Sequence, residues 1–158
     1  MKTKLPLFSA LAFVALCFNG CTPDEAVTTQ NQFKPLIIRV TLANPITQSS
    51  EALGTIDQLS VQDNNFMQTI SGEFPNQVGL GIIERSTTAV SNTPLVVYVD
   101  YLHINGYDAL ENPIYQCNTV NLELIFDGQT VYSESRNLGS EDGSCPDGYA
   151  WAVSYTLP

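Results

Sequence analysis

The chain has 158 residues and an acidic composition, with 16 Asp and Glu against 6 Lys and Arg and a formal net charge of −10. This charge repels the phosphates of nucleic acids and anionic lipid head groups, so it argues against a nucleic-acid partner. The length suffices for one domain with a real core and is short for two.

Residues 1–20 have the three parts of an export signal. Lys2 and Lys4 supply the positive end, Leu5 to Phe18 form an apolar run, and Asn19-Gly20 is a small cleavage approach. The apolar run is shorter than the roughly 20 residues that a helix needs to cross a bilayer. The sequence therefore predicts a cleaved signal peptide and a protein that leaves the cytoplasm.

The junction Phe18-Asn19-Gly20-Cys21 resembles the lipobox of bacterial lipoproteins, in which a small residue precedes a cysteine that receives diacylglycerol and becomes the new N-terminus. That family usually carries Leu or another aliphatic residue where this chain has Phe18. The acidic pair Asp24-Glu25 also resembles the surface-export signal of Bacteroidota lipoproteins. Acyl chains bind a membrane with about 0.8 kcal/mol per buried CH₂.

These resemblances imply a cell-envelope lipoprotein, anchored to the outer membrane through Cys21, that is periplasmic or exposed at the surface. The alternative is an ordinary secreted protein whose signal is cut near Gly20. The segment 21–33 is polar and lacks apolar periodicity, so it predicts a lipidated cysteine on a flexible tether. Residues 34–158 then form a single domain.

The four cysteines separate into two roles. Cys17 lies in the predicted signal and Cys21 is the predicted lipidation site, which leaves Cys117 and Cys145 as the pair of the folded region. Outside the cytoplasm such a pair most often forms a disulfide, which we predict here. The alternative, a zinc site, has too few soft ligands, because the chain has one histidine and no CxxC motif.

Period-two patterns predict strands in the first half of the domain. Alternate apolar residues from Leu36 to Leu42 predict a half-buried strand that Asn44-Pro45 ends. Residues 50–62 fit either a helix or a strand, and we favour the strand. Two short apolar runs, 66–71 and 78–84, flank a predicted turn at Pro75-Asn76. The second run predicts one face formed by Val78, Leu80 and Ile82.

The second half has stronger patterns. Leu95 to Ile104 is apolar on both faces and predicts a central strand covered from two sides. Val120 to Phe126 alternates, and Asp127-Gly128 predicts a two-residue hairpin turn that sets Leu124 opposite Val131. The last predicted strand has one face formed by Tyr149, Trp151, Val153, Tyr155 and Leu157.

Seven or eight short strands with frequent Gly, Pro, Asn and Asp between them predict an all-β fold. We expect an antiparallel β-sandwich, immunoglobulin-like in general architecture, with a small β-barrel as the alternative. Trp151 follows both Cys117 and Cys145 rather than lying between them, so the prediction concerns the architecture and not the immunoglobulin family.

The sequence offers little catalytic chemistry. His103 shares a strand face with Tyr101 while Asp100 points the opposite way, so no dyad forms within that strand. No GxSxG motif occurs. We therefore predict no catalytic residue and interpret His103 as a structural or rim histidine. The hairpin carboxylates Glu123, Asp127 and Glu134 are interpreted as solvated charge.

The segment Ser140 to Gly148 carries three carboxylates, Glu141, Asp142 and Asp147, beside the predicted disulfide. Oxygen ligands in such a loop suit calcium, and the alternative is a polar turn without metal. No other cofactor is predicted. The long loop from Asn105 to Gln116 contains Tyr107 and Tyr115, which we predict as a contact surface.

Two functional hypotheses follow from the sequence. The first is a membrane-anchored envelope protein with a non-catalytic β-sandwich that binds a glycan or a protein partner. The alternative is an extracytoplasmic hydrolase that uses His103 or an acidic pair, which requires these groups to converge in a pocket.

Overall fold

The structure is a computed structural model that describes residues 32–50, 53–64, 66–72 and 76–158. The predicted signal peptide (1–20), Cys21 and the predicted tether up to residue 31 lie outside the described residues, as does Pro75. Within the described residues there is no helix long and apolar enough to cross a membrane.

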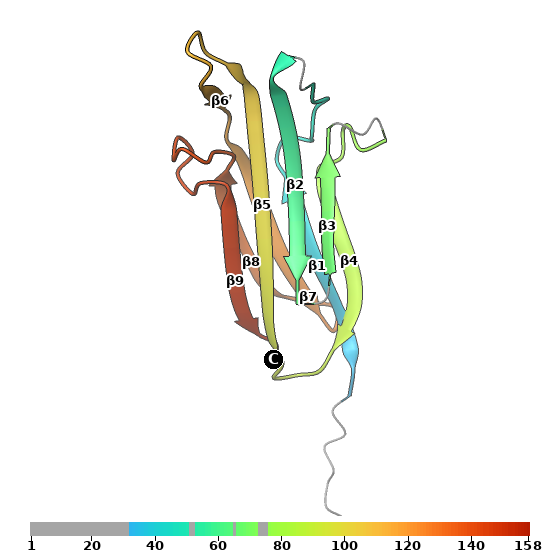
Figure 1. Cartoon of the computed structure of the whole chain (residues 1–158). Coiled ribbons are helices and arrows are strands. Elements are labelled where there is room, and N and C mark those ends of the chain that lie inside the picture. The colour runs from blue at the N-terminus through green and yellow to red at the C-terminus, as the bar shows by residue number, and fades with distance from the viewer. Residues whose placement is uncertain (1–31, 51–52, 65, 73–75) are drawn as a thin grey trace, which may run out of the picture. The chain divides into compact units, whose positions relative to one another are not determined.

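The described residues form nine strands in two antiparallel sheets that pack face to face (Figure 1). The first sheet has the order β4-β1-β7-β8, formed by Ile82–Ala89, Lys34–Leu42, Asn118–Phe126 and Gln129–Leu138. The second has the order β3-β2-β5-β6, formed by Phe66–Ser71, Thr55–Asp63, Pro94–Tyr107 and Pro113–Tyr115, and β9 (Ala150–Thr156) also pairs with β5. The two sheets stay separate, so the predicted β-sandwich is confirmed and the barrel alternative is wrong.

The core lies between the sheets and follows the period-two alternation of the strands. The inward residues of β1, β2, β5, β7 and β9 are buried, among them Leu36, Ile38, Val40, Leu59, Val97, Val99, Leu122, Leu124, Trp151 and Val153. Burying one such side chain stabilises the fold by about 1.5–3 kcal/mol. The predicted first strand and the strand interpretation of 50–62 are confirmed, the latter from Thr55 onward.

The central strand β5 differs from its prediction in one respect. It lies mid-sheet, with β2 on one side and β9 and β6 on the other. However, only one of its faces is covered along its first half, since Val97 and Val99 are buried while Tyr98 is 47% exposed. The prediction of burial on both faces is wrong because β-branched and aromatic residues also favour an exposed sheet face.

The hairpin between β7 and β8 has the predicted turn but a different register. Asp127 and Gly128 both have positive φ, at 52° and 78°. Ile125 pairs with Thr130, but Leu124 pairs with Tyr132 instead of Val131. Val131 is therefore an extra residue that forms a bulge in β8. The periodicity of a strand does not reveal such an insertion.

The prediction of one strand face over residues 78–84 is also wrong. Strand β4 begins at Ile82 and buries Ile83, whereas Val78, Leu80 and Ile82 are exposed. Backbone hydrogen bonds join the stretch before β4 to the chain that follows β1, from Ile46 N to Leu80 O (3.0 Å) and from Gly79 N to Ile46 O (2.7 Å). Val78 and Leu80 therefore belong to a connection and not to a strand, and Ile82 is the exposed first residue of β4.

Candidate functional site

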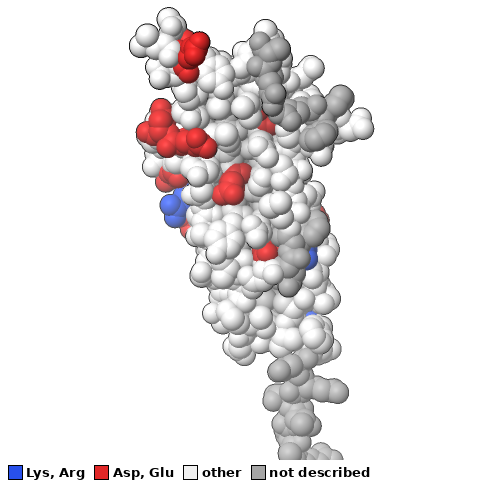
Figure 2. All heavy atoms as spheres, in the orientation of Figure 1, with Lys and Arg blue, Asp and Glu red and all other residues white. Residues whose placement is uncertain are grey.

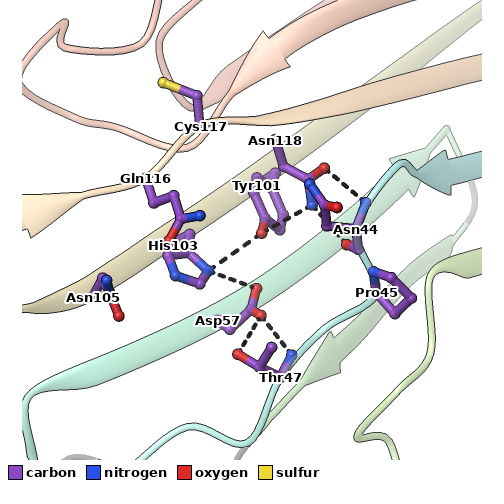
Figure 3. A pocket seen from close by; sticks show the side chains of 10 residues that line it. All are labelled: Asn44, Pro45, Thr47, Asp57, Tyr101, His103, Asn105, Gln116, Cys117 and Asn118. Atoms are coloured by element: carbon purple, nitrogen blue, oxygen red, sulfur yellow. Dashed lines mark hydrogen bonds and ion pairs between the residues drawn. The ribbon is translucent and has the colours of Figure 1, made fainter.

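A pocket of about 170 Å³ opens at the end of the sandwich where β1 and β5 finish and β2 and β7 begin (Figure 3). Its polar lining comes from four separate segments: Asn44 and Thr47 after β1, Asp57 on β2, Tyr101, His103 and Asn105 on β5, and Gln116 and Asn118 around the start of β7. The fold thus assembles the pocket from residues distant in the sequence.

The pocket contains a cross-strand Asp–His pair. Asp57 on β2 is in register with His103 on β5, and Asp57 Oδ1 lies 3.5 Å from His103 Nδ1. Both side chains are largely buried, at 3% and 13% exposure. Asp100, the nearest acidic residue in sequence, lines a separate hollow together with Tyr149, in agreement with the prediction that it does not pair with His103.

Asp57 also holds the connection between β1 and β2. Its Oδ2 accepts hydrogen bonds from the backbone N–H and the hydroxyl of Thr47, at 2.7 and 3.1 Å, and its own N–H donates to Ser49 Oγ at 2.9 Å. Its Oδ1 is buried and accepts no hydrogen bond within the described residues. One carboxylate oxygen therefore fastens the connection, and the other faces His103.

Tyr101 and Asn118 extend this network toward the first sheet. The Tyr101 hydroxyl lies 3.4 Å from His103 Nδ1 and accepts a hydrogen bond from Asn118 Nδ2 at 3.3 Å. Asn118 also donates to the backbone carbonyl of Asn44 at 2.7 Å and accepts from its N–H at 3.1 Å. Because Tyr101 and Asn118 are buried, these bonds fix the pocket wall.

The environment sets the charge of these groups. Burial raises the pKa of Asp57, but the nearby imidazole of His103 and the hydrogen bonds from Thr47 outweigh this effect, so its pKa lies below the ordinary value of 3.8. Burial raises the pKa of Tyr101; the bond from Asn118 opposes this and the charge of Asp57 adds to it. At neutral pH the carboxylate is ionised and the phenol keeps its proton.

The described residues that line the pocket supply no activated nucleophile. The Thr47 hydroxyl donates to Asp57, and Cys117 is bonded to Cys145, with 5.5 Å between their Cα atoms. The predicted disulfide is confirmed. Figure 3 shows the imidazole with Nδ1 turned toward Asp57 and Tyr101 and its other edge toward Asn105 and Gln116. The arrangement suits the binding of a polar ligand.

The loop predicted to bind calcium uses its carboxylates in other contacts. Asp147 Oδ2 accepts from the N–H of Asn137 at 2.7 Å and its Oδ1 lies 3.7 Å from Arg136, while Asp142 Oδ1 accepts from the N–H of Ser144 at 2.8 Å. Across the described part of the chain, no three His, Cys, Asp or Glu residues form a metal-binding group. Calcium binding by Glu141, Asp142 and Asp147 stays a prediction.

Tyr107 and Tyr115 lie on strands and not in a loop. Strand β5 extends to Tyr107 and β6 ends at Tyr115, so the predicted loop from Asn105 to Gln116 shrinks to 108–112. Tyr107 is 49% exposed and its ring packs against Gly54. Burial and the charges of Glu141 and Asp142 raise the pKa of Tyr115, which places it beside that acidic loop. Their role as a contact surface stays a prediction.

The basic residues of the described region all form ion pairs: Lys34 with Asp127, Arg39 with Glu84 and Glu123, Arg85 with Asp63, and Arg136 with Glu134 and Asp147. The hairpin carboxylates therefore have cationic partners, and they also keep contact with solvent, since the side chains of Glu123, Asp127 and Glu134 are 27%, 55% and 39% exposed. Figure 2 shows Asp and Glu gathered over the upper part of the visible face, with little Lys or Arg.

Comparisons of the chain with protein-family models, curated proteins and solved structures give no match. Sequence reasoning missed Asp57, Thr47 and Asn118, which carry the hydrogen bonds of the pocket. The available signal was an acidic residue at an inward position of β2, in the same alternation as Leu59 and Val61.

Proposed function

We propose that this chain is a lipid-anchored protein of the cell envelope whose β-sandwich binds a ligand without transforming it. The observation that carries the proposal is the pocket of Asp57, His103 and Asn118, whose polar groups are fixed by hydrogen bonds and which holds no activated nucleophile among the described residues. A rigid, polar and concave site is the usual form of a binding site for a small ligand or for the end of a larger one.

The position of the pocket in the domain supports this function. Strand β1 begins at Lys34, at the end of the sandwich opposite to the pocket (Figure 1). A tether that joins the domain at Lys34 leaves the pocket at the free end. A partner that enters the pocket therefore does not have to displace the chain at Lys34.

The predicted membrane anchoring is tested by substituting Cys21. The Cys21→Ala variant should be lost from the membrane fraction, and mass spectrometry of the wild-type N-terminus from native membranes should show diacylglycerol on Cys21. Cys17→Ala is the matched control, because this cysteine lies in the predicted signal and its loss leaves lipidation intact. Membrane retention of Cys21→Ala would contradict the lipid anchor.

The second candidate is the hydrolase, which the Asp57–His103 pair favours. A carboxylate that orients an imidazole is the arrangement of a general base, and here the base would have to activate a water molecule. An ester- or glycoside-hydrolysing activity that His103→Gln abolishes and Asp100→Asn keeps would establish this candidate. Equal activity of the wild type and His103→Gln would remove it.

A further inference from the structure

We propose that the pocket binds one neutral sugar residue, through hydrogen bonds between its hydroxyl groups and the free polar groups of Asn44, Asn105, Gln116 and His103. This inference rests on the proposed binding function and names its ligand class. It follows from the donors and acceptors that the pocket leaves unused, from the buried carboxylate that orients His103, and from the size of the pocket.

Three primary amides line the pocket and are not engaged. The side chains of Asn44, Asn105 and Gln116 are exposed and make no hydrogen bond within the described residues, although the backbone of Asn44 bonds to Asn118. An amide offers two donor hydrogens and a carbonyl acceptor, and a hydroxyl group both donates and accepts. A ligand with several hydroxyl groups can therefore satisfy both ends of each amide.

His103 supplies a further acceptor in a defined direction. Asp57 Oδ1 is buried, has no hydrogen-bond partner in the described part of the chain, and lies 3.5 Å from His103 Nδ1. A carboxylate in this position keeps the proton on Nδ1 and leaves the lone pair of Nε2 for a ligand. No hydrogen bond within the described residues uses Nε2, so it can accept one from a sugar hydroxyl. Asp57 is a positioning residue in this arrangement.

Other ligand classes fit less well. An anionic group would meet the ionised Asp57, and no Lys or Arg lies in the lining to offset its charge. An ammonium group has only donors and would leave the amide N–H groups unpaired. An apolar ligand would bury Asn105, Gln116 and His103 without partners, and each unpaired polar group opposes binding.

The size of the pocket indicates how much of a ligand it holds. Its volume of about 170 Å³ lies below the roughly 300–1,000 Å³ of sites that enclose a drug-sized molecule. It therefore accommodates one ring of an oligosaccharide, while the rest of the chain extends outside. A terminal residue of an envelope glycan has this form.

His103 is the one histidine of the chain, so its ring gives a single set of NMR signals that report on the pocket. The purified mature lipoprotein in detergent micelles is titrated with neutral monosaccharides and disaccharides. We expect at least one sugar to shift the ring signals in a saturable manner. Asn105→Ala and Gln116→Ala should each weaken this binding about tenfold, which corresponds to about 1.4 kcal/mol.

Two controls separate direct contact from loss of folding. Asp100→Asn and Tyr98→Ala change the outer face of β5 and should bind like the wild type. Asp57→Asn should weaken binding and also change the ¹⁵N shifts of the imidazole, because the preference for a proton on Nδ1 is lost. A structural role of Asp57 alone would leave the tautomer signature of the folded variant unchanged and would overturn its positioning role.

The probes also distinguish the failure of this inference from the failure of the proposed function. If acetate or methylammonium shifts the His103 signals and no sugar does, the pocket is a binding site and the ligand class is wrong. If no probe of any class shifts them, both the sugar inference and the pocket as the binding site are overturned. The lipid anchor is measured independently at Cys21.

Discussion

Asp57 is the residue on which the pocket depends, because its carboxylate is buried and tied to two neighbouring segments. The hydrogen bonds from Thr47 and the adjacent His103 stabilise its charge against the cost of burial. A carboxyl group whose pKa is lowered by folding stabilises the folded state once it is ionised. Its contribution is therefore present at neutral pH and is lost when the carboxylate takes up a proton.

Asp57→Asn tests this linkage. We expect a loss of about 2 kcal/mol in the free energy of unfolding at neutral pH, since the hydrogen bonds to a charged acceptor are weakened. The difference between variant and wild type should shrink as the pH falls below the ordinary value of 3.8 and through the lowered pKa of folded Asp57. Urea unfolding over a pH series measures it.

Asp100→Asn is the matched control for this experiment. Burial raises the pKa of Asp100, so its charge opposes folding at neutral pH and its neutralisation should leave stability equal or higher. The free energy of unfolding is thus expected to fall in Asp57→Asn and to stay equal or rise in Asp100→Asn. A constant deficit of Asp57→Asn across the acid range would contradict the role of its charge.

Asn118 is the second residue that fixes the pocket. Asn118→Ala leaves the N–H and the carbonyl of Asn44 without their side-chain partner and removes a donor to the Tyr101 hydroxyl. We expect a loss of about 2 kcal/mol, measured by thermal unfolding, because the buried Tyr101 hydroxyl loses a donor and the part-buried backbone groups of Asn44 lose their partner. Asn105→Ala is the control and should change stability little, since that side chain is exposed and makes no such bonds. Equal effects of the two variants would contradict this assignment.

The sequence predicts which face of the strand the His103 side chain lies on, but it does not predict that Asp57 is its partner. Alternation places His103 on the face of Tyr101, whereas the contact with Asp57 depends on the register between β2 and β5. Register is a tertiary property that the hydrophobic pattern of one strand does not determine. The ambiguity of residues 50–62 also hides the inward direction of Asp57, and the pocket could therefore not be predicted.

Among the elements, the link between β6 and β7 depends on the disulfide. Cys117 is exposed and Cys145 is buried, and their bond joins this link to the acidic loop between β8 and β9. The bridge spans 28 residues of sequence. A loop of this length corresponds to a stabilisation of about 3–4 kcal/mol in the chain-entropy model.

The double variant Cys117→Ala, Cys145→Ala should lose about this amount of stability, measured by urea unfolding. The reduced wild type should show a similar loss, which separates the effect of the bond from that of the substitutions. Cys17→Ala is unsuitable as a stability control, because Cys17 lies in the predicted signal, which we expect the mature protein to lack. An unchanged midpoint for the double variant would show that the described β6–β7 link is held by its hydrogen bonds alone.

The sequence pattern predicts which segments form strands, but it does not predict their bulges, their exact boundaries or whether both faces are covered. The alternating patterns of β1, β7 and β9 identify these strands with their buried faces. The bulge in β8 and the connection before β4 follow from backbone hydrogen bonds, which no periodicity reports. The outer face of β5 was mispredicted because apolar composition does not show whether another layer covers it.

For the whole molecule, the two-sheet architecture follows from many short amphipathic strands, which can bury their apolar faces only by pairing sheets. The position of the pocket at one end of the sandwich depends on how the connections close that end, and composition carries no information about it. The acidic surplus, in contrast, is set by composition alone. The effect of this surplus on stability depends on whether attraction within ion pairs or repulsion between carboxylates is larger.

The basic residues of the described region are already paired with carboxylates, and exposed pairs of this kind contribute about 0.2–1 kcal/mol each. Apart from Lys2 and Lys4, which lie in the predicted signal, the chain has four basic residues against 16 acidic ones. Added salt screens attraction and repulsion alike, and repulsion dominates in so acidic a chain. We therefore expect NaCl to raise the melting temperature of the mature protein; a fall would show that the ion pairs dominate.

The same measurement decides the calcium hypothesis. At equal ionic strength, CaCl₂ and MgCl₂ should raise the melting temperature alike if only screening acts. A larger rise with CaCl₂ that a chelator reverses would show a calcium site, because a ligand that binds only the folded state stabilises it. Asp142→Asn should then remove the excess, whereas Asp100→Asn, outside the Ser140 to Gly148 loop, should keep it. An excess that survives Asp142→Asn would place the ion elsewhere, because Glu141, Asp142 and Asp147 would no longer provide the predicted ligand set.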